Sequence, residues 1–171
     1  MPTLAKWLLG VTGILLLGLL VTPLFVHREI CHKATCLNNT RQIGIAVAIY
    51  ITDNDDRFPP SDAWAEVIEG YVKNPDIFRC PTGDWPGRYA FNANLDRVDA
   101  HILSAPDHTP MIFDALAFEV NPAGGLERVD YRHEGGAMFT RTDSSAKYYR
   151  KEEMDQLVWK VPLGPFLERA P

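Results

Sequence analysis

Residues 7–26 form a run of twenty residues without a charged side chain, and this run constrains the fold more than any other feature. As a helix with a rise of about 1.5 Å per residue, it would extend about 30 Å, the thickness of the hydrocarbon core of a bilayer. A cleavable signal peptide has a shorter apolar core and a small-x-small cleavage site, and no such site follows here. The sequence therefore predicts an uncleaved transmembrane anchor over residues 1–28.

Three residues are expected to position this anchor. Trp7 suits the belt of aromatic side chains at a membrane interface, and the long side chain of Lys6 can reach the headgroups. Pro23 is expected to bend the helix near the membrane surface. The charges that flank the run do not fix its orientation, because Arg28, Lys33 and Arg41 stand on the domain side of it.

Composition limits the remaining chain to one ordinary domain. About 140 of the 171 residues follow the anchor, which is enough for a single core. The formal net charge of −5 argues against a nucleic-acid surface, which would need a concentrated basic stripe. Thirteen prolines and twelve glycines indicate many turns and short elements.

The hydrophobic pattern predicts an α+β fold. Apolar residues recur at helical spacing over residues 34–52, and this helix should end near Asp53–Asp56 because Pro59 and Pro60 cannot continue it. Ser61 is a plausible N-cap of a second helix that ends near Gly70. Short strands are expected, followed by a short helix over residues 152–159; the strands are 88–92, 110–113, 129–131, 137–142 and 147–150. One long N-terminal helix, transmembrane in its first half, would pack on this small antiparallel sheet.

Two of the three cysteines could form a disulfide. Cys36 and Cys80 lie at element boundaries with a sequence separation of 44, and a bond between them would contribute about 4 kcal/mol of stability in the chain-entropy model. Two buried free thiols are the alternative. Cys31 is the odd cysteine and could compete for Cys80.

A series of short motifs resembles a known family. In order they are 36–39, 41–44, 53–55, 57–60, 78–81 and 111–114, and then His133, Gly135, Gly136 and Asp143, which fit a histidine, nine residues, aspartate spacing. In this order they resemble the pilin-like, pseudopilin-related proteins of bacteria that carry an H-x9-DG motif. The resemblance implies a pilin-like domain over residues 29–160, a Cys36–Cys80 disulfide and a structural role for the four motif residues.

The chain departs from this family at two places. Ser144 replaces the glycine of the Asp-Gly pair, so the turn there should be longer or looser. The N-terminus has no glycine for the prepilin peptidase, and Lys6 stands where prepilins have glutamate. The resemblance thus implies a chain that has lost processing and self-assembly. It also implies a location in the bacterial inner membrane, with the N-terminus cytoplasmic and the domain periplasmic.

The sequence offers no convincing chemical site. His27, Cys31, His32 and Cys36 lack standard zinc spacing, and the Asp53–Asp56 run lacks the glycine of a calcium loop. A triad of His133, Asp143 and Ser144 lacks a nucleophile elbow. Catalytic, cofactor-binding and metal residues are therefore all predicted to be absent.

Two aromatic residues are candidate contacts with a partner. Trp85 lies in a loop rich in glycine and proline, and Phe166 lies in a proline-rich C-terminal tail over residues 161–171. Packing of either side chain on its own domain is the alternative.

The leading hypothesis is a non-catalytic, single-span accessory subunit whose pilin-like domain docks on a larger membrane complex, respiratory or photosynthetic in kind. The first alternative is a minor pseudopilin of a type II secretion or type IV pilus-like system. The second alternative is a membrane-tethered hydrolase or metal-binding protein. The expected partners are the lipid bilayer and other membrane-protein subunits, with no nucleic acid and no small-molecule substrate.

Overall fold

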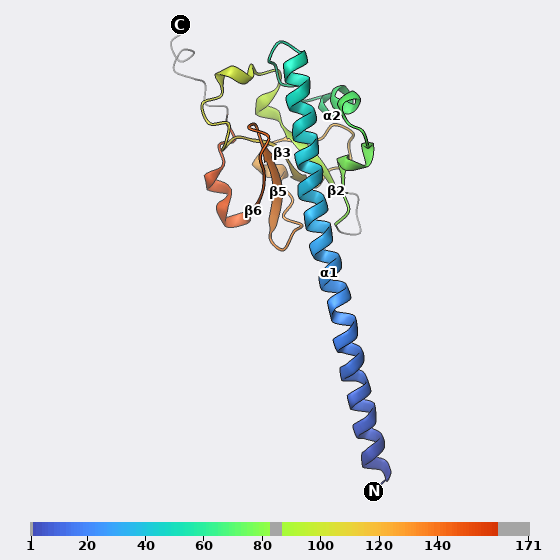
Figure 1. The fold of residues 1–171 in the computed structure, drawn as a ribbon. Helices are drawn as coiled ribbons and strands as arrows, with labels where there is room; N and C mark the ends of the chain where they lie inside the picture. Colours follow the sequence, from blue (N-terminus) through green and yellow to red (C-terminus); the bar gives the residue numbers. More distant parts are fainter. Residues whose placement is uncertain (1, 83–86, 161–171) are drawn as a thin grey trace.

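The computed structural model describes residues 2–82 and 87–160, with side chains left undescribed at 2–5, 8–9 and 23–31. A single long helix, α1 (Pro2–Asp53), runs from the N-terminus to the far end of the domain. Its second half lies across a small sheet, and its first half projects away from the domain (Figure 1).

The sheet follows the order β1-β2-β3-β5-β6, with antiparallel pairing between neighbours. The short strand β4 adds to it by pairing with β2 in parallel. The strands are β1 (Arg79–Cys80), β2 (Gly87–Asn92), β3 (Pro110–Ala115), β4 (Ala123–Gly124), β5 (Gly136–Arg141) and β6 (Ala146–Arg150). Four of the five expected strands are present, whereas residues 129–131 contribute only an isolated bridge between Val129 and Ala115.

The remaining described helices are short. They are α2 (Trp64–Ile68) and the 3₁₀ helices η1 (Glu69–Tyr71), η2 (Pro75–Phe78), η3 (Ala93–Leu95), η4 (Ala100–Ile102), η5 (Leu126–Arg128) and η6 (Lys151–Gln156). Ser61 does not cap α2, which begins after Ala63. The Ser61 amide instead donates to Asp96 Oδ1 at 2.6 Å, which ties the chain before α2 to the end of η3.

Both faces of the sheet carry apolar side chains, and each face has its own cluster. The face toward α1 includes Tyr89, Phe91 and Met138. The opposite face includes Phe113 and Phe139, and Met154 of η6 packs there. Side chains of successive strand residues point to opposite faces, so the continuous apolar strands β3 and β5 supply both clusters.

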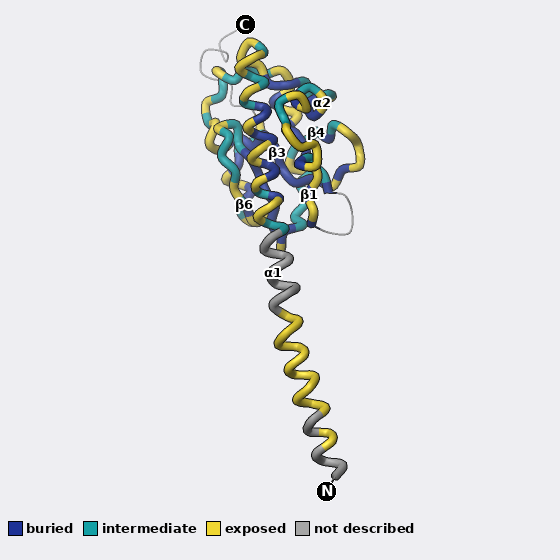
Figure 2. The backbone as a smooth tube through the Cα atoms, turned by 45° about the vertical axis from the view of Figure 1, so that its right-hand side comes forward, coloured by how far each residue is buried: buried dark blue, intermediate teal, exposed yellow. Residues whose placement is uncertain are grey.

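The docked half of α1 presents one buried stripe to the sheet. Cys36, Thr40, Ile43 and Val47 recur at helical spacing and are all fully buried (Figure 2). The helix ends at Asp53, and Asp55 and Asp56 follow with φ values of 53° and 57°. The left-handed backbone conformation of Asp55 and Asp56 reverses the chain direction, so the Asp53–Asp56 run terminates the helix.

The prediction that the first half of α1 spans a membrane is wrong for the part of the chain that the structure describes. No helix there combines the length and the apolar character that crossing a bilayer requires. The single-pass anchor and the inner-membrane location derived from it are therefore withdrawn.

The backbone of α1 continues through Pro23 and across residue 28 without a break, as expected for one long helix. The Pro23 side chain, Trp85, Phe166 and the whole tail over residues 161–171 lie outside the described residues.

We predict that Gly44→Ala lowers the free energy of unfolding by about 1–3 kcal/mol, because overpacking in a close contact has this cost. A Cβ at Gly44 would overlap Cγ2 of Thr140 in β5, so α1 could not keep its distance from the sheet. Gly70→Ala is the matched control, since a Cβ at Gly70 meets no atom within 4 Å. Urea unfolding measures both variants, and equal stabilities would contradict the close approach of α1 to β5.

Candidate functional site

A disulfide joins α1 to the first strand of the sheet. Cys36 in α1 and Cys80 in β1 are bonded, with their Cα atoms 5.3 Å apart, so the predicted pairing is confirmed. Both cysteines are buried. The bond closes a sequence separation of 44, and it restricts the unfolded chain by about 4 kcal/mol.

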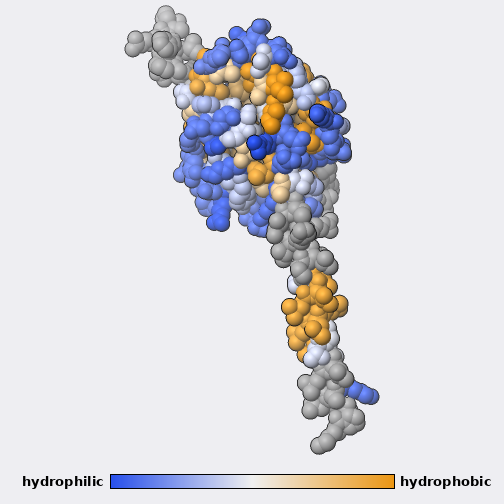
Figure 3. All heavy atoms as spheres, in the orientation of Figure 1, coloured by the Kyte–Doolittle hydropathy of each residue, from blue (hydrophilic) through white to orange (hydrophobic). Residues whose placement is uncertain are grey.

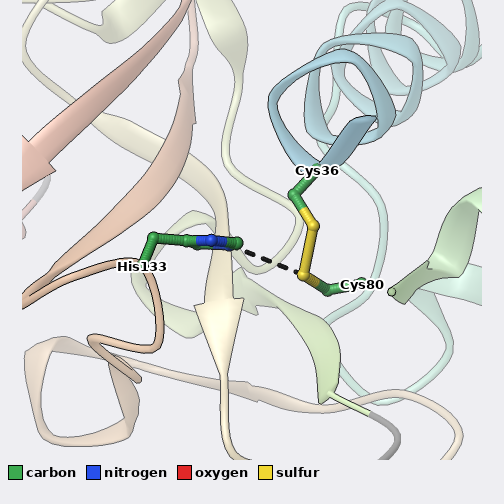
Figure 4. A group of neighbouring side chains, drawn as sticks. All are labelled: Cys36, Cys80 and His133. Carbon is green, nitrogen blue, oxygen red and sulfur yellow. Dashed lines mark hydrogen bonds between the residues drawn. A yellow bond between two sulfur atoms is a disulfide. The ribbon is translucent and has the colours of Figure 1, made fainter. Parts of the chain in front are cut away.

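A buried histidine and a buried carboxylate stand beside this disulfide. His133 Nε2 lies 3.5 Å from Cys80 Sγ, and the ring points at the sulfur (Figure 4). The same nitrogen lies 3.2 Å from Oδ2 of Asp114, and neither side chain is exposed to solvent. The backbone amide of Met138 donates to the same carboxylate oxygen at 2.7 Å. We call Cys36, Cys80, His133 and Asp114 the buried cluster.

The position of His133 follows from the tight turn after it. Glu134 and Gly135 have φ values of 52° and 81°, as in a type I′ turn. His133 and Gly136 exchange backbone hydrogen bonds of 3.0 and 3.1 Å across this turn. The Tyr148 hydroxyl donates to the His133 carbonyl at 2.9 Å, and a Cβ at Gly136 would overlap the Tyr148 ring. Both motif glycines therefore fix the backbone that carries His133.

Asp143 is not a partner of His133. It lies in the β5–β6 loop, exposed, where its Oδ1 accepts from the Ser145 amide at 2.9 Å. Ser144 takes a positive φ of 64° there, so the turn spans residues 142–145 rather than two residues. The imagined triad of His133, Asp143 and Ser144 is not assembled.

Tyr89 closes one side of the cluster. It pairs with Asp114 across β2 and β3, and its hydroxyl donates to the Cys36 carbonyl at 3.4 Å. Burial, reinforced by the nearby Asp114 carboxylate, raises the pKa of Tyr89 well above its usual value of 10.0. Tyr89 therefore stays a neutral hydrogen-bond donor at any physiological pH.

Two polar atoms of the cluster are buried without a hydrogen-bond partner among the described residues. They are Asp114 Oδ1 and His133 Nδ1. Leaving a buried polar group without its hydrogen-bond partner costs about 1–3 kcal/mol. His133 and Asp114 thus each depend on the other for a hydrogen-bond partner in the core.

The arrangement does not suit nucleophilic catalysis. In a catalytic triad the nucleophile and the carboxylate contact different ring nitrogens, whereas Cys80 and Asp114 both face Nε2 of His133. All four side chains are buried, and the surface pocket beside α2 is lined by Glu69, Phe78 and Arg88 rather than by the cluster. The geometry instead suits a structural role or the binding of a small enclosed ion.

The sequence-level search missed Asp114. The signal was available, since Asp114 is an acidic residue at the end of the apolar run Pro110–Phe113. A carboxylate in a fully buried strand needs a partner. Only the register of β3 against β2 and β5 identifies that partner as His133.

The other predicted site residues are scattered. Lys6 and Trp7 are exposed and lie in the first half of α1, which projects away from the domain (Figure 1). In the four-residue metal set, Cys36 is committed to the disulfide and His32 is half-buried. The side chains of His27 and Cys31 lie outside the described residues.

No known protein-family model matches the chain, and neither curated proteins nor solved structures gave a match. The pilin-like assignment thus gains no support, and a pilin-like fold is not assigned. The fold is described by its own elements, a long helix docked on a small antiparallel sheet.

We predict that Tyr89→Phe reduces the loss of stability at alkaline pH. Because the folded pKa is raised, the stabilising difference is fully present below pH 10 and is lost as pH rises above it, where the unfolded tyrosine ionises. The wild-type free energy of unfolding should fall relative to that of the variant by up to about 1.4 kcal/mol per pH unit. Urea unfolding between pH 8 and about pH 11 gives this difference, and parallel curves would show that Tyr89 is not buried.

Proposed function

We propose that this chain is a non-catalytic accessory subunit whose projecting helix inserts among apolar helices of a partner protein. The observation that carries the proposal is the exposed apolar surface of α1 over residues 10–22, here called the projecting segment. Its large side chains stand free of the domain (Figure 3). They are Val11, Ile14, Leu15, Leu16, Leu17, Leu19, Leu20 and Val21.

The projecting segment is apolar on every side. Ile14, Leu15, Leu16 and Leu17 are consecutive, and each is at least 62% exposed. Successive helical residues are separated by about 100°, so four of them cover the whole circumference. A helix that is hydrophobic all round belongs inside a larger apolar environment. A single shallow groove would therefore leave part of it in water, and several partner helices are needed to enclose it.

The chemistry of the segment indicates a partner other than a second copy. Residues 10–22 carry no charge, while Lys6 lies exposed just before them. Parallel packing of two copies would place like charges side by side, which is unfavourable. A different protein with an uncharged, apolar helical surface avoids that repulsion.

The domain supports an accessory role rather than a catalytic one. The cluster of Cys36, Cys80, His133 and Asp114 is closed to solvent and lacks the geometry of a catalytic relay. The disulfide and the buried stripe of α1 hold the helix rigidly on the sheet. The domain thus fixes the direction in which the projecting segment leaves it.

Site-specific photo-crosslinking in cells tests this proposal. A photoreactive residue at Leu15 or Leu19 should give one adduct of discrete mass with a different protein, identified by mass spectrometry. The matched controls are Glu66 and Lys147, which are exposed on the domain and should give no such adduct. Leu16→Asp should lower recovery of the adduct about tenfold or more, because burying a leucine contributes about 1.5–3 kcal/mol.

Three results would contradict the proposal. A ladder of self-oligomers from Leu15 would indicate self-assembly, as in the pseudopilin alternative. Adducts with lipid alone would remove the need for a protein partner. Equal adducts from Leu15 and Lys147 would show that the projecting segment has no special contact.

A further inference from the structure

We propose that the reduced protein binds one Zn²⁺ ion through Cys36, Cys80, His133 and Asp114, so that a disulfide and a metal ion are alternative occupants of the buried cluster. The inference is independent of the projecting segment. It rests on the identity, the distances and the burial of the four side chains.

Three of the four donor atoms already lie within metal-binding range of one another, and the fourth contacts one of the three. The sulfur atoms of Cys36 and Cys80 and a ring nitrogen of His133 all lie within 4.8 Å of each other. Oδ2 of Asp114 lies 3.2 Å from His133 Nε2. The side chains come from α1, β1, β3 and the turn before β5, so the fold rather than a local sequence motif assembles them. No standard zinc spacing in the sequence would reveal such a site.

Two of the distances match edges of a zinc tetrahedron. Bonds of about 2.3 Å to sulfur and about 2.0–2.1 Å to nitrogen or oxygen imply a sulfur–nitrogen edge of about 3.5 Å and a nitrogen–oxygen edge of about 3.3 Å. The structure has 3.5 Å between Cys80 Sγ and His133 Nε2, and 3.2 Å between His133 Nε2 and Asp114 Oδ2. The two sulfurs must separate from a bonded distance to about 3.8 Å once the bond between them is broken. Asp114, which is not among the donor atoms that all lie within 4.8 Å of one another, must also move toward the sulfurs.

The chemistry of the donor set favours zinc over other common ions. Two thiolates, an imidazole and a carboxylate in a closed tetrahedral site are typical zinc ligands, whereas calcium and magnesium prefer oxygen alone. Asp114 Oδ1 is buried without a hydrogen-bond partner in the described chain, so a cation beside this carboxylate would compensate it. The Met138 amide already orients the other oxygen at 2.7 Å.

One feature limits the affinity. A zinc-bound imidazole usually donates its second ring N–H to an acceptor. His133 Nδ1 finds no acceptor within the described residues. The turn at Glu134–Gly135 and the Tyr148 hydroxyl hold the histidine backbone in place instead.

Replacement of the disulfide by zinc takes two steps, a two-electron reduction of the disulfide and then binding of the metal ion. An external dithiol transfers two electrons and two protons to the Cys36–Cys80 bond, which breaks to give two thiols, and the dithiol becomes a disulfide. Zn²⁺ then binds both sulfurs and displaces their two protons to solvent. The metal thereby restores a link between α1 and β1 that reduction removes.

Zinc titration of the full chain in its two redox states tests the inference. All proteins carry Cys31→Ser, so that the third cysteine cannot contribute a ligand. The chain is reduced with a phosphine, freed of metal and titrated with Zn²⁺ against a chromophoric chelator. We expect one zinc per reduced chain and binding to the oxidised chain at least 100-fold weaker, because oxidation removes both sulfur ligands. Co²⁺ in place of Zn²⁺ should give the thiolate charge-transfer band and the visible bands of a tetrahedral site.

Ligand variants separate the cluster from chance surface binding. His133→Gln and Asp114→Asn should each weaken zinc binding about tenfold or more, whereas Asp143→Asn, at an exposed carboxylate outside the cluster, should leave it unchanged. The circular dichroism of each reduced protein is recorded with and without zinc. Zinc should raise the unfolding temperature of the reduced parent chain and restore native signal wherever reduction has lowered it.

Four results would overturn the inference. They are no zinc uptake by the reduced chain, equal uptake by the oxidised chain, a cobalt spectrum without the thiolate band, and uptake by a reduced chain that stays unfolded with zinc bound.

Discussion

The contact between α1 and the sheet is the constraint on which the rest of the structure depends. Cys36 binds Cys80 covalently at one end of this contact, and Gly44 lets the helix approach Thr140 of β5 farther along. The stripe of Cys36, Thr40, Ile43 and Val47 is buried along the same contact. Without this contact the inner face of the sheet would be open to water, and a sheet of a few short strands is marginally stable alone. The cluster around His133 therefore lies where α1, β1, β3 and the turn before β5 meet.

The same helix has two halves with opposite environments. The docked half has a buried stripe and an outer face, on which Ile45 and Ile49 are 44% exposed. The projecting segment has exposed apolar side chains all round, and its backbone leads away from the domain (Figure 2). Isolated helices are marginal in water, so the projecting segment gains from continuity with the docked half and from a partner that covers it. The fold and the proposed function thus both depend on α1, and the disulfide fixes the direction of this helix relative to the sheet.

Many of the helix and strand positions could be predicted from the local pattern of apolar and turn-forming residues. The errors occur where tertiary contacts determine the structure. Strands β2, β3, β5 and β6 and the end of α1 near Asp53 are visible in apolar runs and turn residues. The strand expected over residues 129–131 is wrong, because this segment forms only an isolated bridge to Ala115. The Ser61 cap is wrong, because Asn121 Oδ1 accepts from the Ala65 and Glu66 amides at the start of α2. The partner of His133 could not be read from spacing, since Asp143 fits the family motif while Asp114 comes from a different strand. The apolarity of a helix does not by itself distinguish a lipid bilayer from an apolar protein surface as its environment.

Native-state hydrogen exchange of the oxidised, full-length chain tests the central claim, that the disulfide and the buried stripe clamp the second half of α1 to the sheet. Amides of residues 37–51 should exchange only through global unfolding, with the same free energy as the amides of β3 and β5. In the isolated protein, amides of the projecting segment should exchange through local opening at a much lower free energy. Exchange of residues 37–51 at the low free energy of the projecting segment, while β3 and β5 stay protected, would contradict the claim.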